Sequence, residues 1–194
     1  ELATRLKEIP IQKGLKSDLD LSMFFEKKTF QEILSLRQYF IDRRANKKND
    51  HIDDWIQMVA TNRLTGHSSG FFSVYTFPPN QAVSAKSQIR INEKRQQIPE
   101  YRDTKKIILK KSKGLLRNLS QEQRENLNQA AKTAKFLNTT SNTTKTIKDN
   151  SVQLIVTSPP FLDIVQYVED NWMRCWFNNL DAEEISNQIS VPKD

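Results

Sequence analysis

The chain has 194 residues, with 30 Lys and Arg against 23 Asp and Glu, and its formal net charge is +7. This length allows one medium-sized domain with a hydrophobic core, and the basic excess suits a polyanionic partner. One cysteine, Cys175, excludes a disulfide framework and any cysteine-based zinc site. No apolar run is long enough to span a membrane or to serve as a secretion signal, so a cytoplasmic protein is expected.

The first 137 residues have a mainly helical pattern. The spacing of apolar residues and the capping residues that precede them predict helices over residues 1–10, 17–25, 29–44, 50–64, 84–97, 103–119 and 120–137. The clearest is 50–64, which has aspartates in its first turn and Gly66 placed to end it. The chain begins without an initiator methionine, so we expect it to be the interior of a longer protein.

The segment after this helix is rich in aromatic residues. Residues 71–77 predict a strand or an extended loop, with most of the aromatic side chains in the core. Asn80 and Gln81 follow a rigid Pro-Pro turn, and exposed amides at such a place can read adenine edges. His51 and His67 have no acidic or cysteine partner at metal-binding spacing, so no metal site is expected.

The next two predicted helices are basic. Residues 84–97 carry Lys86, Arg90, Lys94 and Arg95, and residues 103–119 carry Lys105, Lys106, Lys110, Lys111 and Lys113. A solvated surface and contact with nucleic-acid phosphates explain these charges equally well.

After a polar stretch at 138–150, residues 151–157 form an apolar, β-branched run. Pro159 and Pro160 follow it, and neither can donate a backbone hydrogen bond. This pattern is typical of a short buried strand that ends in a stiff loop. In open α/β sheets, ligands bind at the carboxyl ends of strands. A helix is predicted over 162–179, and Asp181 begins a final short helix.

The tetrapeptide Ser158-Pro159-Pro160-Phe161 resembles the catalytic motif of the bacterial site-specific DNA amino-methyltransferases. In that family the first side chain and the carbonyl of the first proline accept the two protons of the exocyclic amino group of adenine or cytosine. The aromatic residue stacks on the base after it has been flipped out of the duplex. The rigid prolines keep these acceptors in place during the reaction.

The runs Val59 to Ala82, Ile91 to Arg95 and Tyr101 to Asp103 also resemble segments of such enzymes. The chain is similar to the helical insertion and the catalytic strand of these enzymes, and this resemblance covers most of its residues. It implies an α/β, Rossmann-like methyltransferase fold, of which this chain is a predominantly helical part with few strands. Residues 1–137 are then a helical insertion or DNA-recognition region. Residues 138–194 are part of the catalytic domain.

The cofactor implied by the resemblance is S-adenosylmethionine, and its binding residues are unknown. The family holds it with a Phe-x-Gly-x-Gly turn, but no two of Gly14, Gly66, Gly70 and Gly114 have that spacing. The resemblance thus implies that the remainder of the enzyme supplies this turn, and that the chain alone binds no cofactor.

The resemblance implies double-stranded DNA as the partner. Ser158 and the Pro159 carbonyl would hold the target amino group on a loop stiffened by Pro160, and Phe161 would stack on the base. The residues assigned to DNA contact are Arg63, Asn80, Gln81, Arg95, Lys105 and Lys106.

Two alternatives remain open. The same loop serves amino-methyltransferases that act on RNA or on a protein glutamine, because these substrates have the same unreactive nitrogen. Alternatively, the chain is a non-catalytic, helical nucleic-acid-binding module in which Ser-Pro-Pro-Phe has a structural role.

Overall fold

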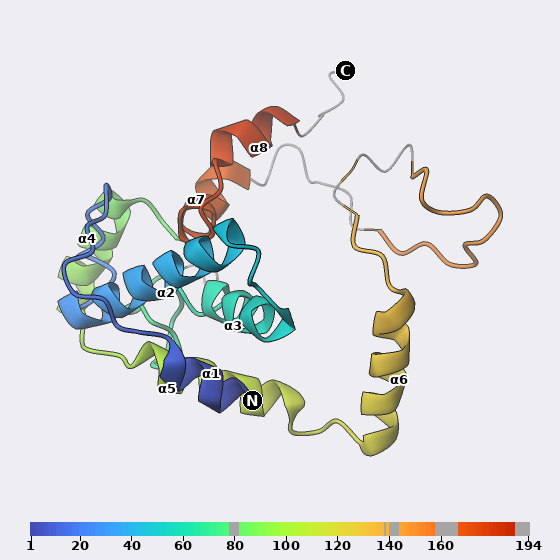
Figure 1. The fold of residues 1–194 in the computed structure, drawn as a ribbon. Coiled ribbons are helices and arrows are strands. Elements are labelled where there is room, and N and C mark those ends of the chain that lie inside the picture. Colours follow the sequence, from blue (N-terminus) through green and yellow to red (C-terminus); the bar gives the residue numbers. More distant parts are fainter. Residues whose placement is uncertain (78–81, 138, 140–143, 158–166, 189–194) are drawn as a thin grey trace.

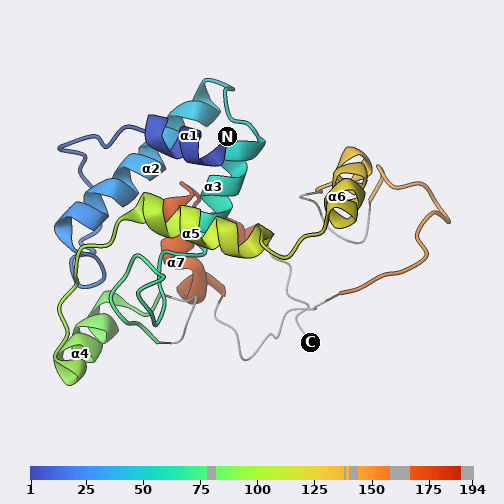
Figure 2. The same ribbon diagram turned by 90° about the horizontal axis from the view of Figure 1, so that it is seen from below.

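The computed structural model describes residues 1–77, 82–137, 139, 144–157 and 167–188, which form eight α-helices and no β-strand (Figure 1). Helix α6 stands apart from the packed body that the other helices form, and two perpendicular views agree on this (Figures 1 and 2). In chain order the helices are α1 (Leu2–Glu8), α2 (Lys27–Ala45), α3 (His51–Thr61), α4 (Ala85–Arg95), α5 (Thr104–Leu116), α6 (Gln121–Thr133), α7 (Tyr167–Phe177) and α8 (Ala182–Gln188).

The predicted α/β fold is wrong for the described part of the chain. Residues 152–157 form neither a helix nor a strand, and Leu154, Ile155 and Val156 are 77, 80 and 87% exposed. A strand satisfies its backbone groups only by pairing, and the described residues provide no strand beside this segment. The one β-type contact among them is an isolated bridge between Gly66 and Tyr75.

Local capping signals set the starts of several helices as the sequence predicts. Ser84 caps α4, Asp103 caps α5, and a capping box of Ser120 and Gln123 begins α6. The start of α2 differs, because the Glu26 carboxylate accepts the first backbone N–H groups instead of Thr29. The Thr29 hydroxyl is bonded instead to the backbone of Arg102.

The predicted helix over residues 17–25 is absent, and the chain makes turns there. These turns place Leu21, Phe24 and Phe25 in the core, each at most 2% exposed. Burial of three large side chains from one short segment outweighs its weak helical pattern.

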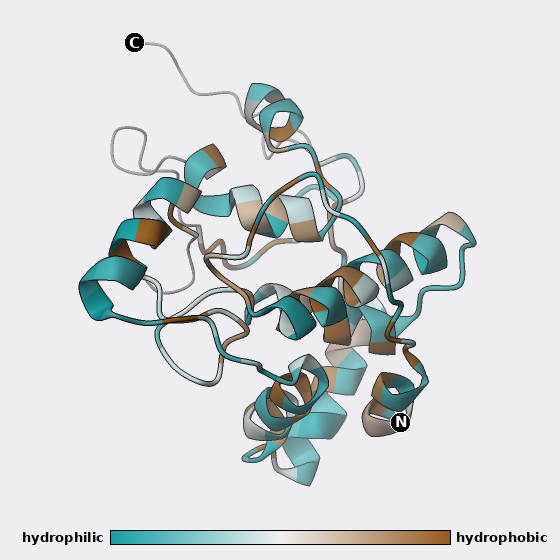
Figure 3. Cartoon of the chain, turned by 90° about the vertical axis from the view of Figure 1, so that its left-hand side faces the viewer, coloured by the Kyte–Doolittle hydropathy of each residue, from teal (hydrophilic) through white to brown (hydrophobic). Residues whose placement is uncertain are grey.

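The core brings together α2 and α7, which lie far apart in the sequence. Ring contacts connect α2 and the turn before it with α7: Phe24 with Trp172, Phe30 with Trp176, and Phe40 with Phe177. Hydrophobic and hydrophilic patches alternate along the helices, as expected for helices that bury one side against a core (Figure 3).

Helix α3 lies between α5 and α7. Its Trp55 indole donates a hydrogen bond to Ser112 of α5, at 2.9 Å. Its Gln57 amide donates to the Asn178 side chain just after α7, at 2.7 Å. The two views agree that α5 and α7 lie on opposite sides of the body (Figures 1 and 2).

Candidate nucleic-acid interface

Helix α5 and the residue that follows it present four cations in one row. Lys106, Lys110, Lys113 and Arg117 follow the spacing i, i+4, i+7 and i+11, and all four residues are exposed. These positions share one side of a helix, and 11 residues correspond to about 16 Å of helical rise. We call these four residues the α5 cationic face.

The opposite side of α5 fixes the orientation of this face. Thr104, Ile108 and Ser112 recur at every fourth position and are at most 1% exposed. The Glu32 carboxylate accepts hydrogen bonds from the backbone N–H and the hydroxyl of Thr104, at 3.0 and 2.9 Å. Burial and hydrogen bonding on one side therefore keep the four cations pointing to solvent.

The α5 cationic face is only partly neutralised. Lys106 forms an ion pair with Asp103 at 3.3 Å, and 84% of its side chain is exposed. Lys110, Lys113 and Arg117 form no ion pair with any described residue. Exposed cations in a row attract a phosphate backbone, which carries about one negative charge per 1.7 Å of duplex axis.

Two residues assigned to DNA contact are neighbours with different environments. Lys106 belongs to the α5 cationic face, whereas Lys105 is half-buried and its ammonium donates a hydrogen bond to the Ile9 carbonyl. Burial lowers the pKa of Lys105. Lys105 thus fastens α5 to the segment after α1 in this structure.

Arg63 and Arg95 both stack on aromatic rings of the 66–77 segment. The Arg63 guanidinium lies 4.0 Å from the centre of the Phe71 ring, and that of Arg95 lies 3.8 Å from the Tyr75 ring. Burial lowers the pKa of Arg63, and its buried Nε atom has no hydrogen-bond partner among the described residues. Arg95 is exposed at the end of α4.

Arg102 connects this segment to α5. Its guanidinium donates to the carbonyls of Ser68, Phe71 and Ser73, and α5 begins two residues later. Phe71 and Phe72 are buried as predicted, whereas Phe77 is 61% exposed. Arg102 thereby fixes the 66–77 segment relative to the first turn of α5.

The remaining predicted site residues lie outside the described part of the chain. These are Asn80, Gln81, Ser158, Pro159, Pro160 and Phe161. The sequence analysis missed Arg117, although its spacing of 11 residues from Lys106 was available as a signal.

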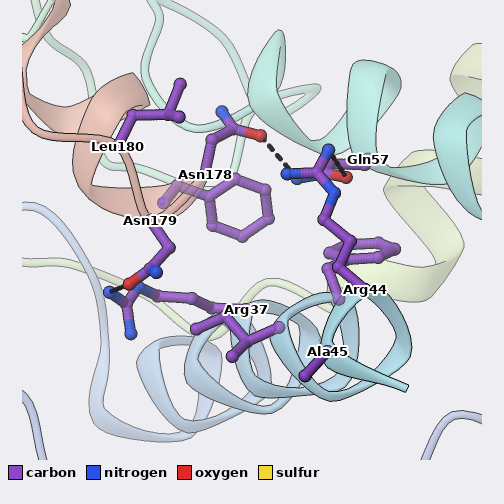
Figure 4. A pocket seen from close by; sticks show the side chains of 10 residues that line it. Arg37, Arg44, Ala45, Gln57, Asn178, Asn179 and Leu180 are labelled. Carbon is purple, nitrogen blue, oxygen red and sulfur yellow. Dashed lines mark hydrogen bonds between the residues drawn. The ribbon is translucent and has the colours of Figure 1, made fainter. Parts of the chain in front are cut away.

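A separate pocket of about 300 Å³ lies between α2, α3 and the segment after α7, and we call it the α2–α7 pocket (Figure 4). Polar and apolar side chains line it: Arg37, Phe40, Ile41, Arg44, Ala45, Gln57, Phe177, Asn178, Asn179 and Leu180. The sequence analysis assigned no function to it.

The α2–α7 pocket does not fit S-adenosylmethionine. This cofactor carries a positive sulfonium, whereas the charged groups that line the pocket are the guanidinium groups of Arg37 and Arg44. No carboxylate lines it to accept the ribose hydroxyls. The described residues also contain no group of three or more His, Cys, Asp or Glu side chains that could hold a metal ion.

No family model matches this chain, and neither does any curated protein or solved structure compared with it. None of the described helices has the length and apolar character needed to cross a membrane. The function must therefore be argued from the residues of the chain itself.

Proposed function

We propose that this chain is the DNA-binding, largely helical part of a cytoplasmic enzyme that methylates the exocyclic amino group of cytosine or adenine in DNA, with S-adenosylmethionine as methyl donor. The observation that carries DNA binding is the α5 cationic face. The observation that carries the reaction type is the sequence Ser158-Pro159-Pro160-Phe161.

In this proposal the α5 cationic face contacts the phosphate backbone. Its four cations neutralise successive phosphates, which gives affinity and orientation but no sequence selectivity. Arg63 and Arg95 are held against aromatic rings of the 66–77 segment, so each guanidinium is presented in a restricted orientation. Restricting such a group before binding lowers the entropic cost of a DNA contact.

The residues of the 158–161 loop act on a base outside the duplex. The Ser158 hydroxyl and the Pro159 carbonyl accept the two amino protons, which returns electron density to the nitrogen. Phe161 stacks on the base, and the prolines limit reorganisation of the acceptors. Because the α2–α7 pocket does not fit the cofactor, no step that involves the cofactor is assigned to the described residues.

DNA binding can be tested with fluorescence anisotropy on a labelled duplex over a range of salt concentrations. The triple variant K110Q/K113Q/R117Q removes three phosphate contacts. The negative slope of log K against log salt should therefore become shallower by about 2.7. A matched control, K13Q/K16Q/K48Q, removes the same charge from exposed lysines outside α5 and should keep a slope near that of the unmodified chain.

Equal losses in the two triple variants would show that overall charge, rather than the α5 cationic face, determines binding. The charge-preserving variant K110R/K113R should bind like the unmodified chain. Circular dichroism on each variant checks that α5 remains helical.

Base capture can be tested independently of methyl transfer. A duplex with 2-aminopurine as the target base should become more fluorescent when the chain flips that base out. F161A should abolish this increase while the anisotropy signal is retained. Transfer of labelled methyl groups to DNA, RNA and protein substrates by the chain joined to the remainder of the enzyme then separates the three amino-methylation alternatives, and S158A serves as the inactive control.

A second candidate is a non-catalytic, helical nucleic-acid-binding module. The absence of a strand among the described residues favours it, and so does the lining of the α2–α7 pocket, which does not fit the cofactor. DNA binding through α5 without capture of the 2-aminopurine base would support this candidate and overturn the enzymatic one.

A further inference from the structure

We propose that the α2–α7 pocket binds an elongated dicarboxylate with a non-polar middle. Two arginines stand at opposite ends of this pocket, and apolar side chains lie between them (Figure 4). This inference is independent of DNA binding, because no residue of the α5 cationic face lines the pocket.

Arg37 marks one end of the pocket. Its Nε donates to the Trp176 carbonyl at 2.8 Å, and one Nη donates to the Asn179 side chain at 2.7 Å. Its guanidinium also lies 5.5 Å from the centre of the Trp176 ring. These contacts fix its position but use two of the five N–H donors that an arginine carries.

Arg44 marks the other end. One of its Nη atoms donates to the Gln57 side chain at 2.9 Å, and the Gln57 amide in turn donates to Asn178. Asp54 lines an adjoining depression that Arg44 shares, yet the two residues form no ion pair. Most N–H donors of this guanidinium thus have no partner among the described residues.

The lining contains two positive charges and no negative charge. Arg37 and Arg44 are seven residues apart on α2, which corresponds to about 10 Å of helical rise. A carboxylate can accept two parallel hydrogen bonds from a guanidinium, so each end is suited to one carboxylate. In Figure 4 the guanidinium groups of Arg37 and Arg44 lie at different ends of the pocket, so the two sites suit two separate carboxylates.

The middle of the pocket is apolar. Phe40 and Phe177 are buried, and their rings meet edge to face with centres 6.3 Å apart. Ile41 and Leu180 complete this apolar lining. A methylene chain between the two carboxylates would cover this apolar surface.

The experiment is isothermal titration calorimetry on the full chain with linear dicarboxylates from succinate to azelate. The expected result is an affinity that rises with length to an optimum and then falls, because both carboxylates must reach their arginines. Octanoate, which has one carboxylate, should bind about tenfold more weakly than the best dicarboxylate or worse.

Variants assign the binding to the two arginines. R44Q should weaken the best dicarboxylate about tenfold while leaving octanoate nearly unchanged. R37Q should behave likewise, and since Arg37 also contacts Trp176 and Asn179, circular dichroism and thermal unfolding must confirm its fold. R90Q removes an exposed arginine of α4 that does not line the pocket and should have no effect.

Three outcomes would overturn the proposal. These are affinity without dependence on length, octanoate binding as tight as that of the best dicarboxylate, and unchanged dicarboxylate binding in R44Q. Absence of any heat of binding for the whole series at millimolar concentrations, together with no rise in melting temperature, would overturn it as well.

Discussion

Helices α3 and α6 both begin with a capping box, but α3 is packed in the core and α6 is exposed to solvent. A capping box of Asp50 and Asp53 begins α3, and a capping box of Ser120 and Gln123 begins α6. Five residues of α3 are buried, whereas every residue of α6 is exposed. Local sequence signals therefore set where a helix begins, while only tertiary contacts decide whether it contributes to a core.

The capping box of α3 also belongs to a buried ion network, which α6 lacks. The Asp53 carboxylate accepts hydrogen bonds from Arg5, Tyr39 and Arg43 at 2.6, 3.0 and 2.7 Å. One acidic side chain thus joins α1, α2 and α3. In α6 the corresponding Gln123 side chain accepts a hydrogen bond from the Ser120 backbone N–H at 2.9 Å.

The largest effect is expected for D53N. This change removes the charge that two arginines surround, so the free energy of unfolding should fall by about 3–5 kcal/mol. Urea unfolding followed by tryptophan fluorescence measures it. D54N is the matched control, because Asp54 is the exposed neighbour in the same helix, and a similar loss in both variants would contradict a special role for the network.

A smaller effect is expected for G66A. A Cβ atom at Gly66 would lie 2.5 Å from the Phe71 ring, so the packed 66–77 segment must shift. We expect a loss of about 1–3 kcal/mol in the same unfolding measurement. At Gly70 a Cβ atom would come no closer than 3.5 Å to Ser68. G70A should therefore be nearly neutral, and a loss as large as that of G66A would contradict the packing argument.

S120A should destabilise α6 without destabilising the rest of the structure. Loss of the cap costs about 1 kcal/mol, and a 13-residue helix without packing has little to compensate for it. Hydrogen exchange in residues 121–133 should become faster while the urea midpoint of the body stays the same. A shift of that midpoint would show that α6 contributes to the stability of the body.

The smallest effect is expected on the acid dependence of unfolding, through Asp50. The Arg5 guanidinium, which bonds to Asp50, is the main cause that lowers the pKa of this carboxyl below its ordinary value of 3.8. A lowered folded-state pKa means that this stabilisation is present above pH 4 and is lost as the pH falls further. D50N should reduce the acid dependence of unfolding, whereas D149N, in the exposed 144–157 segment, should not.

The sequence predicted helices where a capping residue and a one-sided apolar pattern coincide, as at Asp103 and Ser120. The helix predicted over 17–25 was wrong because turns place three large apolar side chains in the core. Local spacing does not encode this long-range effect. The strand predicted at 151–157 was wrong because a β-branched run predicts a strand only if another strand is available to pair with it.

For the candidate site, the sequence identified Lys106 and the basic character of α5. It did not separate Lys105 from Lys106, since only the fold brings the Ile9 carbonyl to one of two adjacent ammonium groups. The α2–α7 pocket depends on the contact of α2 with a helix that lies more than 120 residues later, at Trp176 and Asn179. The assignments of Ser158 to Phe161 remain predictions.

Because α7 packs in the core, the core is built from two stretches of the chain that are separated in the sequence. Residues 1–116 supply most of it, and Met173 and Phe177, each 1% exposed, complete it from beyond residues 117–166. This connection sets the effective concentration at which α7 meets its partners. If the chain were cut within residues 144–157, the fragment that contains α7 would have to bind the other fragment to complete the core. Assembly of the two fragments would then depend on their concentration.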